Sequence, residues 1–367
     1  MKYKIYTLGQ LAKIKYGKSK KKVASEDGNI PIYGTGGLMG HANAYLYDKP
    51  SVLIGRKGTI NKVRYIEEPF WTVDTLFYTE INESLVYPRY FYYMLSQIDL
   101  LQYNEGTTIP SLRAETLNRL EFQVPTLVEQ EKIVSLIYPI EEKIKNNCAI
   151  NKNLEQQAEA IFNQEFLCFS KLPEGWKQGC LLDIADYLNG LAMQKFRPAD
   201  GEKGIPVLKI KELRQGACDS NSDLCSPSIR SEYIIHDGDV IFSWSGSLLV
   251  DFWCGGICGL NQHLFKVTSN KFNKWFYYAW TNYHLSKFAA IAADMATTMG
   301  HIKREELSKS QVLIPSKEDY SRIEGIIAPI YDLIIANRIE NRKLSELRDS
   351  LLPRLMSGEI NVLDINF

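Results

Sequence analysis

An internal duplication with a long period constrains the fold of this chain more than any other feature of its sequence. Thr107-Thr108 returns as Thr297-Thr298, an offset of 190 residues (297 − 107). The same offset holds without insertion or deletion as far as Leu154, which matches Leu344. Repeats of this length are whole domains rather than small stacked units, so the sequence predicts two related halves.

Upstream of each conserved stretch the match is looser and the offset drifts. Val52–Gly58 lies opposite Val240–Gly246, and Tyr90–Tyr93 lies opposite Trp275–Tyr278. Each half therefore has a variable front part and a regular back part. Two recognition domains that share a fold but differ in specificity would show this pattern, and so would an old duplication that has drifted.

The regular parts carry an apolar seam that alternates steps of four and three residues, which is typical of a long helix with a coiled-coil surface. A helix of about 40 residues spans about 60 Å. The first copy of the seam consists of Ile133, Ile137, Ile140, Ile144, Asn147, Asn151, Leu154, Ala158 and Ile161. The second consists of Ile323, Ile327, Ile330, Ile334, Asn337, Asn341, Leu344, Arg348 and Leu351.

Both helices have start signals, because Thr126 to Glu129 fits a capping box and Ser316 to Asp319 nearly does. Pro139 and Pro329 predict a kink or break inside each helix. A polar residue on a seam costs stability but fixes register and partner.

We therefore expect an antiparallel pair of helices in which Asn147 and Asn151 lie near Asn337 and Asn341. The alternative is that each helix packs only on its own domain. Close packing should end at Arg348, where the first copy has Ala158.

The front parts read as irregular β-rich domains, with short apolar strands broken by glycine and a closing aromatic helix at Tyr90–Leu95 or Trp275–Trp280. The glycine-rich stretch 34–40 lacks the lysine and hydroxyl residue of a phosphate loop. Residues 55–62 instead combine glycines with three cations, a hydroxyl and an amide after a strand. Such side chains read base edges in DNA, although an ordinary surface hairpin would look similar.

Charge is unevenly distributed although the formal net charge of the 367 residues is zero. Residues 1–64 contain 13 basic and 3 acidic side chains, a difference of +10 (13 − 3). A local basic surface attracts phosphate whatever the total charge of the chain, although lysine runs are often only solvated surface.

Several functional classes lack support in the sequence. The seven cysteines and five histidines show no metal-ligand spacing, so we expect no metal site and free thiols in a reducing compartment. No apolar run predicts a membrane span or a signal peptide, so we expect a cytoplasmic chain. We find no phosphate-loop lysine motif, helicase-like acidic box or Asn-Pro-Pro-aromatic methyltransferase signature, and no clustered nucleophile and base.

The sequence resembles the specificity subunits of type I restriction-modification systems over nearly its whole length. The tail 347–360 looks like the end of that family's second conserved helix, and 107–112 with 122–133 looks like the start of the first. Residues 31–34, 51–61 and 70–77 are similar to one recognition-domain subtype, and 237–242 with 261–266 resemble another.

The resemblance implies a non-catalytic, DNA-reading subunit with an α+β fold: two irregular β-rich target-recognition domains separated by two long antiparallel helices, as a pseudo-two-fold internal repeat. The domains would be residues 1–125 and 171–315, and the helical spacers 126–170 and 316–367. Each domain would read one half of a split double-stranded target, and the helices would set the unspecified spacer. Two methyltransferase subunits would dock on them, and motor-nuclease subunits could join. S-adenosylmethionine, ATP and magnesium would bind only to those partners.

Candidate DNA contacts are carried over as positions, because such residues differ with specificity in the family. In the first half they are Lys20, Lys21, Lys22, Arg56, Lys57, Thr59, Asn61, Lys62, Thr107 and Thr108. In the second half they are Lys209, Lys211, Ser243, Trp244, Ser245, Asn261, Gln262, Thr297 and Thr298. His263 could face DNA or pack in the core. The rival readings are a specificity subunit for a fused nuclease-methyltransferase of another restriction class, a helical adaptor that does not bind DNA, and an enzyme with an unrecognised site.

Overall fold

The computed structural model describes residues 3–294 and 304–364, which fall into two compact units. Unit 1 consists of residues 1–142 together with 346–367, and unit 2 consists of residues 143–345. Both long helices are divided between the units, α4 after residue 142 and α10 after residue 345. Among the described residues, no helix combines the length and apolar character that crossing a membrane requires.

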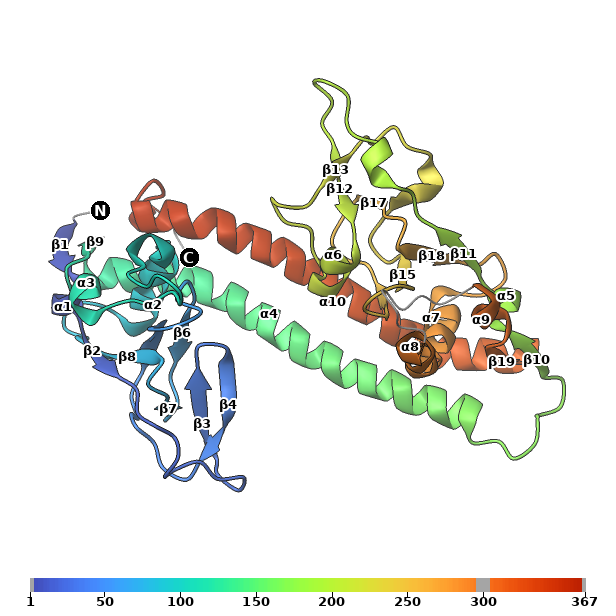
Figure 1. Cartoon of the computed structure of the whole chain (residues 1–367), viewed down its shortest axis with the longest axis horizontal. Coiled ribbons are helices and arrows are strands. Elements are labelled where there is room, and N and C mark those ends of the chain that lie inside the picture. Colours follow the sequence, from blue (N-terminus) through green and yellow to red (C-terminus); the bar gives the residue numbers. More distant parts are fainter. Residues whose placement is uncertain (1–2, 295–303, 365–367) are drawn as a thin grey trace. The chain divides into compact units, whose positions relative to one another are not determined.

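Unit 1 begins with a β-rich domain that leads into the first long helix (Figure 1). Its elements are β1 (Lys4–Thr7), α1 (Leu8–Leu11), β2 (Ala12–Tyr16), β3 (Ile30–Gly34), β4 (Gly37–Ala42), β5 (Ser51–Gly55), β6 (Val63–Ile66), β7 (Trp71–Thr72), β8 (Leu76–Ile81), α2 (Pro88–Ser96), the 3-10 helix η1 (Leu100–Tyr103), α3 (Ala114–Asn118), β9 (Glu121–Val124) and α4 (Leu127–Phe162).

Unit 2 contains the second β-rich domain and most of the second long helix. Its elements are the π-helical η2 (Asn163–Leu167), β10 (Lys177–Cys180), α5 (Leu181–Ile184), β11 (Asp186–Asn189), η3 (Met193–Lys195), β12 (Ile205–Leu208), α6 (Ile210–Gln215), β13 (Leu224–Cys225), η4 (Ser231–Tyr233), β14 (Ile234–Ile235), β15 (Val240–Ser243), β16 (Leu249–Phe252), β17 (Cys258–Leu260), β18 (Leu264–Thr268), α7 (Lys274–Tyr283), α8 (Leu285–Asp294), α9 (Arg304–Ser308), β19 (Gln311–Ile314) and α10 (Lys317–Ser357); η5 (Val362–Asp364) belongs to unit 1.

The duplication seen in the sequence is also present in the strand pairing. Unit 1 has a four-stranded antiparallel sheet in the order β2-β8-β5-β6, and unit 2 has β11-β18-β15-β16. A smaller sheet contains one parallel pair in each unit, β3 with β7 and β12 with β17. A two-stranded ribbon, β1-β9 or β10-β19, closes each domain. The two predicted β-rich domains therefore share one framework, although the smaller sheet has three strands in unit 1 and four in unit 2.

The core of each domain is built from the aromatic helix that the sequence predicted. Tyr90, Phe91 and Tyr93 of α2 are buried in unit 1 beside Ile133 and Ile137 of α4. In unit 2, α7 places Trp275, Phe276 and Trp280 in the equivalent core with residues of α4 and α10. Each sheet is thus packed against a seam, and this burial supplies the main stabilising force of each unit.

Helix α4 begins as its capping box predicts: the Thr126 backbone N–H donates to Glu129 Oε2 at 2.9 Å, and the Glu129 N–H donates to Thr126 Oγ1 at 3.4 Å. In α10 the Asp319 N–H donates to Ser316 Oγ at 3.2 Å.

The sequence predicted a kink or break at each internal proline. Neither helix breaks there: α4 continues through Pro139 and α10 through Pro329. Both prolines lie on an exposed helix face, so the carbonyl that each leaves without a donor can bind water.

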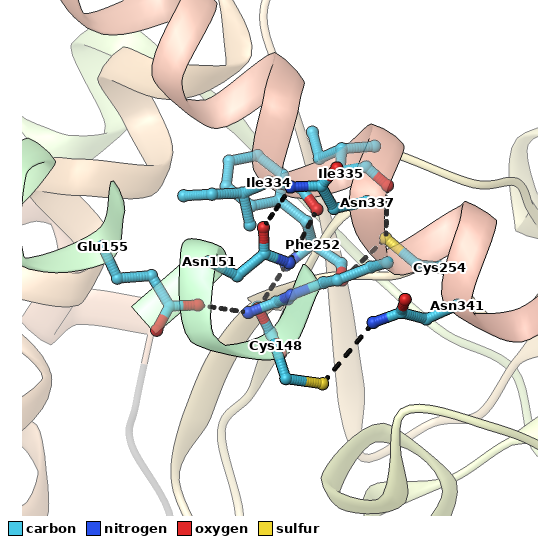
Figure 2. A network of polar contacts seen from close by, with 11 residues as sticks. Cys148, Asn151, Glu155, Phe252, Cys254, Ile334, Ile335, Asn337 and Asn341 are labelled. Atoms are coloured by element: carbon cyan, nitrogen blue, oxygen red, sulfur yellow. Dashed lines mark hydrogen bonds and ion pairs between the residues drawn. The ribbon is translucent and has the colours of Figure 1, made fainter. Parts of the chain in front are cut away.

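Within unit 2 the two seams are antiparallel and in contact through their asparagines. Asn147 Nδ2 donates to Asn341 Oδ1 at 2.8 Å, and Asn337 Nδ2 donates to Asn151 Oδ1 at 2.8 Å. Figure 2 shows the second pair, with Asn151 also donating to the Ile334 carbonyl. The four amides face one another instead of solvent, as the seam predicted.

Close packing does not end at Arg348, contrary to the expectation from the sequence. Within unit 1, Leu352 and Leu355 lie in the same core as Ile133 and Ile137 of α4. Arg348 turns its guanidinium to Asp349, with Nε 2.8 Å from Oδ1, and so leaves the apolar packing on either side intact. An arginine can do this because its long aliphatic stem lies along apolar surface while its head stays in water.

Candidate nucleic-acid interface

The turn between β5 and β6 in unit 1 carries five of the ten DNA contacts predicted in the first half of the chain. Gly55 allows the tight return of the chain, because a Cβ there would lie 2.2 Å from the Thr59 carbonyl oxygen. Gly58 has a φ of +89°, a conformation that glycine adopts without strain. The Arg56 N–H donates to the Thr75 carbonyl at 2.8 Å. The turn is therefore a fixed feature held by backbone contacts, although most of its side chains are polar.

A second predicted segment, which contains Thr107 and Thr108, lies against this turn. The Gly58 N–H donates to the Pro110 carbonyl at 2.9 Å, and Lys57 and Ser111 form a β-bridge. Asn104 shapes the segment, since its Oδ1 accepts 2.9 Å hydrogen bonds from the N–H groups of Gly106 and Ser111. Both threonines are exposed, so the structure brings together two candidate groups separated by about 50 residues in the sequence.

Arg56 is held inside unit 1 by two neighbours. Its Nη1 donates to the Asp74 carbonyl at 2.7 Å, and its guanidinium carbon lies 5.3 Å from the centroid of the Tyr16 ring. Such a contact adds about 0.5–1 kcal/mol at a partly exposed site. The remaining donors of the guanidinium stay available, so Arg56 can position the turn and still face a ligand.

The other cations of the turn are free of carboxylates. Lys57 and Lys62 are exposed, as are Thr59 and Asn61, and neither lysine forms an ion pair within the described parts of the chain. The candidate run Lys20–Lys22 occupies a separate loop, which is joined to the β3–β4 hairpin by the bridge between Ala24 and Ala42. Unneutralised ammonium groups of this kind favour a polyanion.

Unit 2 repeats this construction with different side chains. Gly246 follows β15 with a φ of +65°, as Gly58 follows β5. Trp244 occupies the position of Arg56, and its Nε1 donates to Asn189 Oδ1 at 3.1 Å. Asn189 stands on β11 where Tyr16 stands on β2, because each pairs with the phenylalanine of the next strand in its sheet. The same two positions are therefore in contact in both units.

Most of the other contact residues predicted for unit 2 are buried or hydrogen-bonded inside the domain. Ser243, Ser245 and Asn261 are buried, and Ser245 Oγ lies 3.2 Å from His263 Nδ1. Gln262 Nε2 lies 3.3 Å from the other ring nitrogen of His263. Trp244, Gln262 and His263 are half-buried. His263 thus belongs to a polar cluster at the surface and does not pack in an apolar core.

Lys209 and Lys211 differ from Lys57 and Lys62 of the unit 1 turn because both have acidic partners. Lys209 Nζ forms an ion pair and a hydrogen bond with Asp223, which lowers the pKa of that carboxyl. Lys211 Nζ lies 3.2 Å from Asp219, whose pKa is lowered first by the Asn221 backbone N–H and then by Lys211. The candidates Thr297 and Thr298 lie outside the described residues.

Sequence reasoning missed the residues that hold each turn in place, namely Tyr16, Asp74, Asn104 and Asn189. The repeat contained one usable signal, since Tyr16 and Asn189 each precede the matched glycines Gly17 and Gly190. Those glycine N–H groups donate at 3.0 Å to the carbonyls of Leu76 and Leu264. In the described residues, no cluster of histidine, cysteine, aspartate or glutamate has the arrangement of a metal site.

The comparisons with known proteins agree with one another. The family profile described as "Type I restriction modification DNA specificity domain" matches residues 1–156 and 173–348. The MjaIX type I restriction enzyme specificity subunit of Methanocaldococcus jannaschii is 23% identical over 346 residues, which cover 87% of this chain and 80% of that protein. The HindI specificity subunit of Haemophilus influenzae is 20% identical and covers 77% and 79%.

A solved structure shares the fold. The crystal structure of a type I restriction-modification S subunit from M. genitalium aligns with a TM-score of 0.67 and 15% identity, over 97% of this chain and 96% of that one.

Proposed function

The chain belongs to the family of type I restriction-modification DNA specificity proteins, whose role is non-catalytic recognition of a DNA target, and from this premise we propose that its two units read the two halves of a split, asymmetric sequence. The family acts on DNA together with other restriction-modification subunits.

One observation carries the proposal: the same turn recurs on the same sheet in both units with different chemistry. Arg56 and Lys57 occupy the positions that Trp244 and Ser245 occupy in unit 2. Cations hydrogen-bond to guanine edges and to phosphate, whereas the indole of Trp244, whose one donor is bonded to Asn189, offers stacking surface. Recognition of two different half-sites requires this combination: the same backbone turn in both units, with different side chains facing the bases.

The partners that we propose are two methyltransferase subunits, with motor-nuclease subunits that can join them. The duplication supports the number two, because α4 and α10 are matched copies in sequence that begin with similar caps. S-adenosylmethionine would bind to the methyltransferases, and ATP and magnesium to the motor-nuclease. The two helices would fix the length of the unspecified spacer between the half-sites.

Single-molecule methylation sequencing tests this proposal in cells that express the active methyltransferase partner with and without this gene. A two-part adenine motif that appears only with the gene is the expected result. Exchanging residues 1–125 for the first domain of a relative should then change one half of the motif and leave the spacer length unchanged. A gene-independent methylation pattern would overturn the proposal in favour of a helical adaptor, and a changed spacer would overturn the role of the helices.

A further inference from the structure

The hairpin β3–β4 of unit 1 exposes apolar side chains that the fold does not use. Leu38 and Met39 are 58% and 50% exposed at the start of β4, which is an edge strand of its three-stranded sheet. Single exposed apolar residues are common on protein surfaces. These two are notable because residues 34–40 contain no charged side chain and four glycines, so the tip of the hairpin is uncharged and thin.

The backbone around Leu38 is open to a close approach. A Cβ added at Gly36 or Gly40 would meet no atom within 4 Å, so there is unfilled space beside each of them. Successive residues of a strand point to opposite faces. Met39 folds back over Gly34, where its sulfur would lie 2.3 Å from an added Cβ. Leu38 is therefore the apolar side chain that projects freely from the hairpin.

The hairpin adjoins the cationic turn described above. A Cβ added at Gly58 would lie 3.7 Å from Thr35 Oγ1, and one added at Gly37 would lie 3.4 Å from Arg64 Nη2. Arg64 lies on β6 and Gly58 in the β5–β6 turn, so the tip of the hairpin and the turn form one continuous surface. An uncharged ribbon beside unpaired cations fits a ligand that is anionic along its edges and uncharged between them, with single apolar groups exposed there.

Double-stranded DNA has this arrangement, and its major groove admits a two-stranded β-ribbon. We propose that the β3–β4 hairpin enters the major groove of the first half-site and that Leu38 contacts the methyl group of a thymine there. This inference rests on the proposed function, because it names one base contact of the same surface. Lys57 and Lys62 would hold the flanking phosphates, while Leu38 would add sequence preference without adding charge.

The test uses the full chain assembled with its methyltransferase partner and duplexes that carry the mapped target. Deoxyuridine replaces thymine at each A·T pair of the first half-site in turn, which removes only the methyl group. At one position the wild-type complex should lose about fourfold in affinity, the value of a single buried methyl group. The Leu38→Ala complex should lose a similar factor on the natural target and nothing further on the deoxyuridine duplex.

Two controls separate this contact from general damage. Leu363→Ala removes a leucine of similar exposure (48%) on η5 and should leave affinity unchanged. Leu38→Ala should also leave the dependence of affinity on salt unchanged, because no phosphate contact is lost.

Equal deoxyuridine effects in wild type and Leu38→Ala would overturn the inference, as would a first half-site without an A·T pair. Loss of complex assembly in Leu38→Ala would overturn it by assigning the hairpin to a protein partner. If the wild-type complex has no specific target at all, the proposed function itself fails.

Discussion

Asn151 and Asn337 are 186 residues apart in the sequence and hydrogen-bonded to each other, with 2.8 Å between Asn337 Nδ2 and Asn151 Oδ1. Asn151 is 6% exposed and also donates to the Ile334 carbonyl at 3.3 Å. An amide buried on a seam is stable only if its polar atoms find partners. The pair therefore favours one antiparallel register of α4 against α10 within unit 2.

Asn151→Ala should lower the free energy of unfolding by about 1–3 kcal/mol, because it leaves the half-buried Asn337 amide and the Ile334 carbonyl without their partner. Urea unfolding monitored by circular dichroism measures the loss. Asn153→Ala is the matched control, since Asn153 is an exposed asparagine on the same helix and its replacement should change stability by no more than about 0.5 kcal/mol. Equal effects of the two variants would show that the buried pair does not stabilise the helices.

Arg56 and Tyr16 should act on DNA recognition as a pair. Arg56→Ala is expected to weaken recognition of the first half-site and leave the second unchanged, because the guanidinium contacts only unit 1. The effects of Arg56→Ala and Tyr16→Ala should be less than additive, with a coupling of about 0.5–1 kcal/mol. Binding of the assembled complex to duplexes altered in one half-site measures both.

Tyr16→Phe serves as the control for that experiment, since it keeps the aromatic ring below Arg56 and should preserve the coupling. A loss of affinity divided equally between the two half-sites would instead identify Arg56 as a general phosphate contact.

Lys57 and Lys209 should differ in how their removal changes the response to salt. Lys57 is exposed and has no carboxylate partner in the described residues, so Lys57→Ala should reduce the slope of log affinity against log salt by about one. Lys209 already neutralises Asp223, so Lys209→Ala should change the slope much less. Filter binding or fluorescence anisotropy over a range of salt concentrations decides between them. A larger change for Lys209 would mean that DNA displaces Asp223.

The sequence predicted the repeat, the long helices and their asparagine contacts because each depends on a regular spacing of residues. Such spacing can be read directly from one sequence. The break at Pro139 was not realised because the sequence does not state that this proline lies on the exposed helix face. Packing beyond Arg348 was missed for a related reason. A charged residue on the seam was taken to end the packing, whereas Leu352, one turn after Arg348, and Leu355, the next seam position after Leu351, fill the core of unit 1.

The candidate site was predictable as a turn but not as a surface. The residue types of 55–62 indicated polar contacts, whereas the approach of 104–111 depends on the Gly58–Pro110 hydrogen bond between distant segments. In unit 2, the repeat and the family resemblance placed Ser243, Ser245 and Asn261 among the contacts, and only the structure shows that they are buried. Exposure and pairing of side chains are tertiary properties that one sequence without relatives does not reveal.

Stability should depend on pH through Glu165 and Arg322, which join η2 to α10 within unit 2. Arg322 Nη1 and Nη2 donate to the two carboxylate oxygens of Glu165 at 3.0 and 2.7 Å. These hydrogen bonds lower the pKa of Glu165 below its ordinary value, against the opposing effect of burial. A carboxyl whose pKa is depressed by folding stabilises the protein above its unfolded pKa of about 4.3, and that contribution is lost as pH falls through the folded value.

Glu165→Gln should therefore be less stable than wild type at neutral pH, with a difference that shrinks as pH falls below about 4. Thermal unfolding midpoints at several pH values measure this difference. Glu174→Gln is the matched control, because Glu174 is exposed, lies in the same unit and forms no ion pair among the described residues, so its midpoint should follow wild type at every pH. A difference between Glu165→Gln and wild type that stays constant down to pH 3 would show that the glutamine disturbs packing and that the ion pair contributes nothing measurable.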